Sequence, residues 1–463
     1  MKTSFAWISG VCAAVLSLSS AGCDGGGDGT GGNAGAGGST GGTGGTTSPA
    51  GGGGTGGTGT TSMGGTGGTG TTSMGMPFTS KGDSSYETQT SLAADDQGGV
   101  VAVWIAFFAD NTSGIGYAVS RDGGDTWTAP SVVKSPDGRL ASNPVVVADS
   151  KGVFSLAWLG FRVDGNGPDE HIYVSHLDNG TDTFGAPIIA SDDGTKTTLD
   201  FDKPGMKVGP ADELLLTWAD FSATANGGPA NLTFARSTNG TDFTKSIITS
   251  DATFGNLASL CVDLSDPAVG APLHLVHLGA NGTVTLRTST DDGANWTLKS
   301  TPATMTLFQD ITCAAFGKDL WIAYASGTAL FSPTEDSPAD AVMVMHSSSG
   351  GTNFDTPVDV TNGAQGEQFL FPQLVRAASG KLGVVYYQGV VDGNAQLVLA
   401  SSADGKTWTT SPIAASGKLT IDRTIASWLG AYVGFAIQAN GLVSYADNSE
   451  NKSHIKFAQI ALP

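Results

Sequence analysis

The stretch SRDGGDTW at residues 120–127 decides the fold, because its residue types recur along the chain at a similar spacing. STDDGANW at 289–296 repeats its Ser, Asp, Gly and Trp, and SADGKTW at 402–408 is a version one residue shorter. Three weaker copies fill the intervals: SHLDNGTDTF at 175–184, STNGTDF at 237–243 and SSSGGTNF at 347–354. An internal repeat of this kind is typical of a closed, repetitive architecture.

The aromatic residues that close the copies give the period of the repeat. They follow one another at intervals of 57, 59, 53, 58 and 54 residues: Trp127, Phe184, Phe243, Trp296, Phe354 and Trp408. Short apolar strands precede each copy, for example VVAVWIAF at 100–107, and no helical periodicity persists after residue 89. This pattern predicts an all-β fold. A seventh unit at 428–462 offers three strands without a copy of the turn.

The residue types of the repeated turn suit a local structural role. In a tight turn between two antiparallel strands, a short carboxylate can accept unpaired backbone N–H groups, and glycine permits a positive φ. The aromatic ring then packs against neighbouring strands. We therefore interpret three Asp–Trp pairs as structural and not as catalytic: Asp122 with Trp127, Asp291 with Trp296, and Asp404 with Trp408.

These copies resemble the Asp box of the BNR repeat, and the resemblance covers residues 89–463. It implies that residues 77–463 form a β-propeller of four-stranded antiparallel blades in the sialidase-like superfamily, with the boxes at its periphery. Six boxes and one unit without a box predict seven blades. The segment PFTSKGD at 77–83 is expected to add the outer strand of the last blade, because an unpaired edge invites aggregation. Six blades, as in sialidases, is the alternative.

The N-terminal part predicts export and anchoring. Residues 1–22 read as a signal peptide, with Lys2 before a short apolar run. The sequence Ala21-Gly22-Cys23 resembles the bacterial lipobox, which implies lipidation of Cys23, although Ser20 stands where that motif usually has Leu. The alternative is ordinary cleavage without a lipid. Residues 24–76 are a Gly/Thr-rich linker with too little apolar surface to fold, and such a coil spans about 40 Å.

The net charge and the cysteines limit which binding partners and which cellular location we expect. The net charge of −20 repels polyanions, so a nucleic-acid partner is excluded. The expected location is the bacterial cell envelope, with the chain anchored to a membrane through the lipid, or else the extracellular space. Cys261 and Cys313 lie in the first strands of consecutive repeats, where an exported protein can form a disulfide. Two buried free thiols are the alternative.

The resemblance raises the question of sialidase chemistry. Sialidases hold a sugar carboxylate with three arginines and use a Tyr/Glu pair as the nucleophile. Here only Arg376 and Arg423 occupy suitable first-strand positions, and Tyr432 and Tyr445 fit packing roles as well. We assign no catalytic residues and expect a non-catalytic binding or scaffold module for a glycan or protein ligand. A sialidase-like glycoside hydrolase is the alternative, and convergence of both arginines with a third cation would favour it.

Acidic residues gather around the ends of the first strands, which raises the question of calcium. They are Asp95, Asp96, Asp149, Asp200, Asp202, Asp263, Asp266 and Asp310, and the loop 164–170 adds further oxygen ligands. If these residues ringed one mouth of the channel, they would suit calcium, which prefers oxygen ligands. Solvated turn carboxylates are the simpler interpretation, so we assign no metal site and no cofactor.

Overall fold

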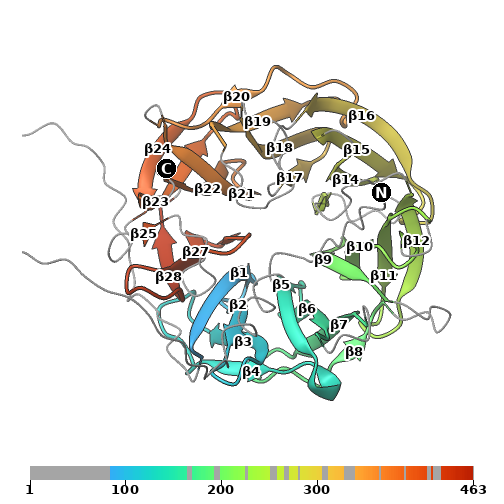
Figure 1. The fold of residues 1–463 in the computed structure, drawn as a ribbon. Coiled ribbons are helices and arrows are strands. Elements are labelled where there is room, and N and C mark those ends of the chain that lie inside the picture. The colour runs from blue at the N-terminus through green and yellow to red at the C-terminus, as the bar shows by residue number, and fades with distance from the viewer. Residues whose placement is uncertain are drawn as a thin grey trace, which may run out of the picture.

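The computed structural model describes residues 84–163, 169–191, 199–224, 228–250, 258–264, 271–279, 282–304, 311–327, 339–363, 366–390, 393–413, 419–420 and 429–461. Within these residues the chain forms seven antiparallel sheets arranged as a ring (Figure 1). The predicted all-β propeller with seven blades is confirmed, and the six-blade alternative is wrong. The signal peptide, Cys23, the linker and the segment 77–83 lie outside the described residues.

Each blade is a meander in which strands pair in chain order, with the first strand nearest the centre of the ring (Figure 1). Blades 1 and 2 comprise β1(Tyr86–Ala94), β2(Val100–Phe107), β3(Ser113–Ser120), β4(Ser131–Val133), and, after the turn η1(Pro136–Gly138), β5(Leu140–Ala148), β6(Phe154–Phe161), β7(His171–Leu177), β8(Ile188–Ile189). Blades 3 and 4 comprise β9(Phe201–Val208), β10(Leu214–Asp220), β11(Asn231–Ser237), β12(Thr244–Thr249), β13(Ala258–Cys261), β14(Leu273–Leu278), β15(Thr283–Ser289), β16(Thr297–Thr304).

The remaining three blades follow the same order. Blades 5 and 6 comprise β17(Ile311–Phe316), β18(Asp319–Ser326), β19(Ala341–Ser347), β20(Val358–Asp359), β21(Gln368–Arg376), β22(Leu382–Gly389), β23(Asn394–Ser402), β24(Thr409–Ile413), with β25(Leu419–Thr420) also paired to β23. Blade 7 comprises β26(Gly434–Ile437), β27(Gly441–Asp447), β28(His454–Ile460). Among the described residues, no helix is long and apolar enough to cross a membrane.

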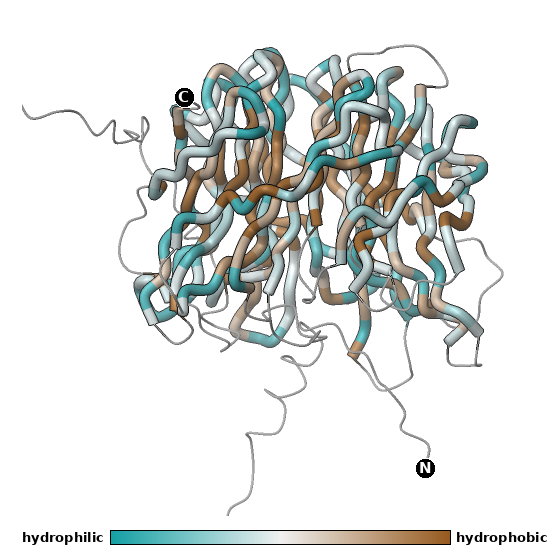
Figure 2. Tube along the Cα trace, turned by 90° about the horizontal axis from the view of Figure 1, so that it is seen from above, coloured by the Kyte–Doolittle hydropathy of each residue, from teal (hydrophilic) through white to brown (hydrophobic). Residues whose placement is uncertain are grey.

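The core lies between neighbouring blades. Every residue of β2, β6, β10 and β22 is buried, because each of these second strands is covered on both faces. Trp104, Trp158 and Trp218 occupy equivalent positions and are at most 1% exposed. The Trp158 ring stacks on Tyr173, with centroids 5.4 Å apart. Figure 2 shows the hydrophobic positions within the body of the ring and many hydrophilic ones at its two faces.

Four first strands share an irregularity that shapes the centre of the ring. In β1, β5, β9 and β21 two residues bulge out of register, and the first of them has a positive φ: Gln89 (48°), Asn143 (50°), Lys203 (49°) and Phe371 (56°). In three of the bulges the second residue is proline, which has no N–H to donate to the ladder. Non-glycine residues with positive φ are strained, so the packing around the channel holds them in place.

The first strand of blade 1 closes the ring against blade 7. The backbone N–H of Glu87 donates to the Ser453 carbonyl at 2.8 Å. Its carboxylate accepts the Ile455 N–H at 3.2 Å and lies 3.4 Å from Nδ1 of His454. Glu87 is 1% exposed, so these bonds join the two ends of the propeller inside the protein. Whether 77–83 forms the outer strand of blade 7 lies outside the described residues.

A disulfide joins the first strands of blades 4 and 5. Cys261 at the end of β13 and Cys313 in β17 are bonded, with Cα atoms 5.4 Å apart. Both residues are buried, at 1% and 5% exposure. The pairings β13–β14 and β17–β18 have no register shift. The two cysteine side chains therefore keep the orientation expected from their positions in the repeat.

Candidate functional site

The repeated turns lie between the third and fourth strands of their blades, away from the centre of the ring. In the first turn, Asp122 Oδ1 accepts the Ser120 hydroxyl at 2.8 Å and the Thr126 N–H at 2.8 Å. The Trp127 indole donates to the Gly124 carbonyl at 3.0 Å. The turns of Asp291 and Trp296, and of Asp404 and Trp408, repeat this bonding, which occupies each carboxylate with donors from its own turn.

These bonds stabilise the ionised form of each turn aspartate. The Thr126 and Asn295 side chains lower the pKa of Asp122 and Asp291 respectively. The backbone N–H groups of Thr407 and Lys406 lower the pKa of Asp404 to about 2. A carboxylate that stays ionised well below neutral pH does not serve as a general acid near pH 7.

The glycine and the aromatic of a turn dock its blade onto the preceding one. Gly293 has φ 87°, and a Cβ at that position would lie 2.0 Å from the ring of Phe234 in β11. The Trp296 ring meets the same Phe234 ring edge-on, with centroids 5.3 Å apart. The turn therefore fixes both its own hairpin and the angle between two blades, and it contributes nothing to the centre of the ring.

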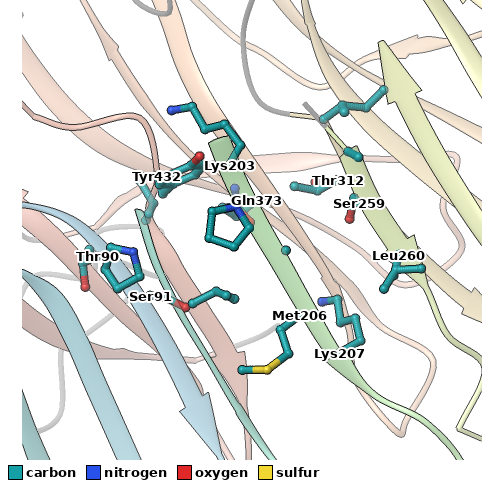
Figure 3. Close-up of a pocket in the computed structure, with 17 residues that line it drawn as sticks. Thr90, Ser91, Lys203, Met206, Lys207, Ser259, Leu260, Thr312, Gln373 and Tyr432 are labelled. Carbon is teal, nitrogen blue, oxygen red and sulfur yellow. The ribbon is translucent and has the colours of Figure 1, made fainter. Parts of the chain in front are cut away.

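A cavity of about 130 Å³ lies at the centre of the ring, and all seven blades contribute to it (Figure 3). Its polar lining residues include Thr90, Ser91, Ser259, Thr312 and Gln373, from β1, β13, β17 and β21. Apolar groups such as Val145, Met206 and Leu260 fill the positions between them. The cavity is thus lined mainly by first strands, and in four of them a bulge helps to set which side chains face the channel.

Residues of β9 and the segment before β26 complete the wall. Lys203 occupies the bulge of β9, is 7% exposed, and places Nζ 4.9 Å from the ring centroid of Tyr432. Lys207 lies four residues further along the same strand and is exposed. Both lysines and Tyr432 line the cavity (Figure 3). Neither lysine was predicted from the sequence. The signal that could have identified Lys203 is the following Pro204, because the bulges of β5 and β21 contain the matching pairs Asn143-Pro144 and Phe371-Pro372.

Buried and half-buried carboxylates gather where blades 2 and 3 meet. Asp202 Oδ1 accepts the amide of Asn143 at 2.9 Å, and Glu170 Oε2 accepts the Phe201 N–H at 2.5 Å. Burial, and then the charge of Asp200, raises the pKa of Glu170 well above its usual range. Burial, with Asp202 and Asp220 nearby, raises the pKa of Asp200 to about 6. Asp200 can therefore hold a proton at mildly acidic pH.

Replacing Asp200 with asparagine is expected to stabilise the protein at neutral pH. Because the folded state raises this pKa from 3.8 to about 6, the favourable contribution of Asp200 is complete below pH 4 and is lost as pH rises through 6. The neutral amide avoids that loss, and we expect a gain of about 1 kcal/mol at pH 7.5 that disappears near pH 4. Urea denaturation at both pH values measures it, with the exposed Asp178→Asn as the control. An equal effect at both pH values would contradict the assignment.

The acidic residues considered for calcium are divided between the two ends of the first strands. Asp95 and Asp149 follow β1 and β5, where each accepts two backbone N–H groups of its own hairpin turn. Asp200 and Asp202 instead stand at the start of β9. Within the described part of the chain, no group of three or more His, Cys, Asp or Glu residues is placed to hold a metal ion. Asp266, Asp310 and most of the loop 164–170 lie outside that part.

The arginines considered for a sialidase-like clamp do not meet at the cavity. The Arg376 guanidinium lies 3.7 Å from the ring centroid of Phe316 and donates to the Ala377 carbonyl. Arg423 lies outside the described residues, and none of the six described arginines lines the cavity. Tyr432 does line it, whereas Tyr445 is buried within β27. The described arginines therefore form no carboxylate clamp there.

No protein-family model and no curated protein matches this sequence. Among solved structures, the chain is similar to a protein of unknown function from Dyadobacter fermentans, with 14% identity, a TM-score of 0.50, and coverage of 85% of this chain and 100% of that one. It is also similar to Trypanosoma rangeli sialidase in complex with sialic acid, with 12% identity, a TM-score of 0.48, and coverage of 73% of this chain and 57% of that one. A third similar structure is an α-L-arabinofuranosidase mutant from Fusarium graminearum, with 12% identity, a TM-score of 0.47, and coverage of 85% of this chain and 98% of that one. The chain thus spans little more than half of the sialidase chain. At these identities the likeness shows the propeller fold alone.

Proposed function

We propose that this chain is a binding module displayed at the bacterial cell surface, which takes one sugar unit of a glycan in its central cavity. The observation that carries the proposal is a cavity that all seven blades line, with serine and threonine residues, the amide of Gln373 and the ring of Tyr432 in its wall. Hydroxyl groups both donate and accept hydrogen bonds, so they match a ligand that is itself rich in hydroxyls. Cavities with an apolar lining and a few converging polar groups are the usual binding sites of small ligands.

The size of the cavity suits a single ring. Its volume of about 130 Å³ is close to that of engineered cavities of roughly 150 Å³ that bind benzene. Rigid walls favour binding without a large ordering cost, and the bulged first strands supply such walls. A longer glycan would place one terminal unit inside the cavity and leave the rest in solvent.

We assign the repeats to the BNR Asp-box kind, with the boxes as structural turns, and the N-terminal region to a lipid anchor. The bonding of Asp122, Asp291 and Asp404 within their turns supports the first assignment. The sequence Ala21-Gly22-Cys23 and the linker at 24–76 support the second. In this view the linker holds the propeller about 40 Å from the membrane, where it can reach extracellular ligands.

The anchor is tested by localisation of the full-length chain. We expect wild-type protein in the membrane fraction, labelled by a fatty-acid probe, and the Cys23→Ser variant in the soluble fraction without label. Because the linker and propeller are unchanged, loss of the lipid alone accounts for that shift. A Cys23→Ser protein that stays with the membrane would rule out the lipid as its anchor.

Binding is tested with the Cys23→Ser protein on a glycan array, followed by calorimetry with the best ligands. Retention of glycans, and weaker affinity when Thr90→Val or Gln373→Leu removes a polar group from the wall, is the expected result. Ser411→Ala, in the outer strand β24, is the control that should leave affinity unchanged. The absence of binding to every glycan would overturn the proposal.

A glycoside hydrolase is the second candidate, and one observation favours it. Glu170 and Asp200 have raised pKa values beside other carboxylates, as the acid of a glycosidase pair requires. A panel of fluorogenic glycosides, sialosides included, tests this candidate. Turnover that disappears in both Glu170→Gln and Asp200→Asn would establish catalysis and displace the binding-only function.

A further inference from the structure

The seam between the first strands of blades 2 and 3 holds a carboxylate that no described group neutralises. β5 and β9 lie side by side in the ring (Figure 1). Asp200 comes directly before β9 and is half-buried. Within the described part of the chain, its side chain makes no hydrogen bond and no ion pair. The charges that act on it are those of Asp202 and Asp220, which have the same sign and so oppose its ionisation.

Two further side chains with acceptor oxygens adjoin Asp200. Glu170 Oε2 accepts the Phe201 N–H at 2.5 Å. Asn143 Nδ2 donates to Asp202 Oδ1 at 2.9 Å, so both side chains bond to residues within two positions of Asp200. Asn143 is 2% exposed, and among the described residues its Oδ1 is buried without a hydrogen-bond partner. A buried acceptor without a donor costs free energy, so a ligand that supplies a donor would stabilise this seam.

The two arginines on this side of the ring pair with a different carboxylate. Arg139 Nη2 lies 2.5 Å from Asp169 Oδ2, and Arg162 Nε lies 3.4 Å from the same oxygen. Neither Glu170 nor Asp200 forms an ion pair within the part of the chain that the structure describes. Burial, and then like charges, raise the pKa of both carboxyl groups. The seam is therefore an acidic environment that a cation would stabilise.

From these observations we infer that the acidic seam, defined as Asn143, Glu170 and Asp200, binds the ammonium group of a sugar that carries a free amine. The inference rests on the proposed glycan-binding function and narrows its ligand. An ammonium group has three donors and no acceptor, which matches a set of carboxylate and amide oxygens. Hydrogen bonds between charged groups are roughly twice as strong as those between neutral groups, so the amine would add affinity as well as selectivity.

The acidic seam adjoins the cavity in which the sugar ring is proposed to bind. Pro144, which lines the cavity, directly follows Asn143. Lys203, which also lines it, directly follows Asp202, and its ammonium lies 4.9 Å from the ring centroid of Tyr432. A substituent of a sugar ring in the cavity can therefore extend to the seam. The net charge of −20 favours the approach of a cationic ligand from solvent.

An ammonium group fits the seam better than a metal ion does. Within the described residues, no group of three or more His, Cys, Asp or Glu is placed to hold a metal ion. Calcium needs six or more oxygens at about 2.3–2.6 Å from one point. An ammonium group needs only three acceptors, at about 2.9 Å, and an amide oxygen serves as well as a carboxylate.

Calorimetry of the full-length Cys23→Ser protein with glucose, glucosamine and N-acetylglucosamine tests the inference, since the three share a ring and differ in one substituent. At about pH 7, glucosamine is expected to bind at least about tenfold more tightly than the other two, with the gain reduced by added salt. The gain requires ionised Asp200, whose pKa is about 6, so it should be lost as the pH falls through 6. Asp200→Asn should remove most of the gain, and the exposed Asp178→Asn should not.

The outcomes separate the inference from the function beneath it. No binding of glucosamine, no preference for it over the two uncharged sugars, or a gain that survives in Asp200→Asn would overturn the inference, while glycans retained on the array would leave the proposed function standing. Binding of no sugar at all, on this panel and on the array, would overturn both. Asp200→Asn is expected to stabilise the fold at neutral pH, so a lost gain in this variant reports on the acidic seam and not on unfolding.

Discussion

Replacing Cys261 and Cys313 together with alanine is expected to lower the free energy of unfolding by about 4 kcal/mol, since the bond closes a loop of 52 residues and restricts the unfolded chain. The bond joins the first strands of blades 4 and 5, so the loss concerns the angle and spacing of those two blades. Urea denaturation of the oxidised wild-type protein and the double variant measures the difference. Hydrogen exchange should show the largest loss of protection in β13 and β17.

Reduction provides the matched control for this prediction. A reductant should destabilise the wild-type protein by a similar amount and leave the double variant unchanged, because the variant has no disulfide in the fold. Both sulfur atoms are buried, so reduction is expected to need local opening and to proceed slowly in native conditions. A double variant as stable as the oxidised wild-type protein would show that the bond adds nothing to the fold.

The fold could be predicted because the repeated turns encode their structure locally. The carboxylate of Asp122 accepts donors from within its own turn, and Gly293 and Trp296 pack on the adjacent blade. Such contacts need only a few consecutive residues and one neighbouring strand, so residue types at fixed spacing reveal them. The unboxed last unit was identified as a blade by its three strands alone.

The cavity could not be predicted, because a bulge in a first strand changes which of its side chains face the channel. A shift of one residue moves a side chain to the other face of a strand. Lys203 sits in the bulge of β9 and reaches the cavity, although the charge pattern gave no reason to select it. The position of Arg376 in the repeat suggested that it faces the channel, yet Arg376 comes after the bulge of β21 and packs on Phe316.

The calcium hypothesis shows the same limit in another form. Asp95 and Asp202 both lie near a terminus of a first strand. Asp95 follows the last residue of β1, whereas Asp202 is the second residue of β9. An acidic residue near a strand terminus in the sequence does not reveal whether that terminus is the start or the end of the strand, and so does not reveal on which face of the ring the residue lies. Only the strand boundaries separate the turn carboxylates of Asp95 and Asp149 from the buried group around Asp200.

Ring closure leads to the second large effect, which concerns Glu87. Replacing Glu87 with alanine is expected to lower the free energy of unfolding by about 3 kcal/mol, because it leaves the buried Ile455 N–H and His454 without their carboxylate partner. Glu87→Gln keeps an acceptor for the N–H and should lose less. Chemical denaturation of the three proteins should give a free energy of unfolding that is highest for the wild type, lower for Glu87→Gln and lowest for Glu87→Ala.

The location of the loss distinguishes closure from a general packing defect. Since Glu87 joins β1 to β28, hydrogen exchange in Glu87→Ala should increase first in blades 1 and 7 and only later in blades 3 to 5. Asp182→Ala removes the carboxylate that pairs with Arg121 at the surface, and it should cost less than about 1 kcal/mol. A Glu87→Ala protein that loses no more stability than this control would mean that other contacts hold the ring closed. Blades 1 and 7 pack their apolar faces together, so a weakened closure exposes two apolar sheet faces at once and makes aggregation at elevated temperature the accompanying result.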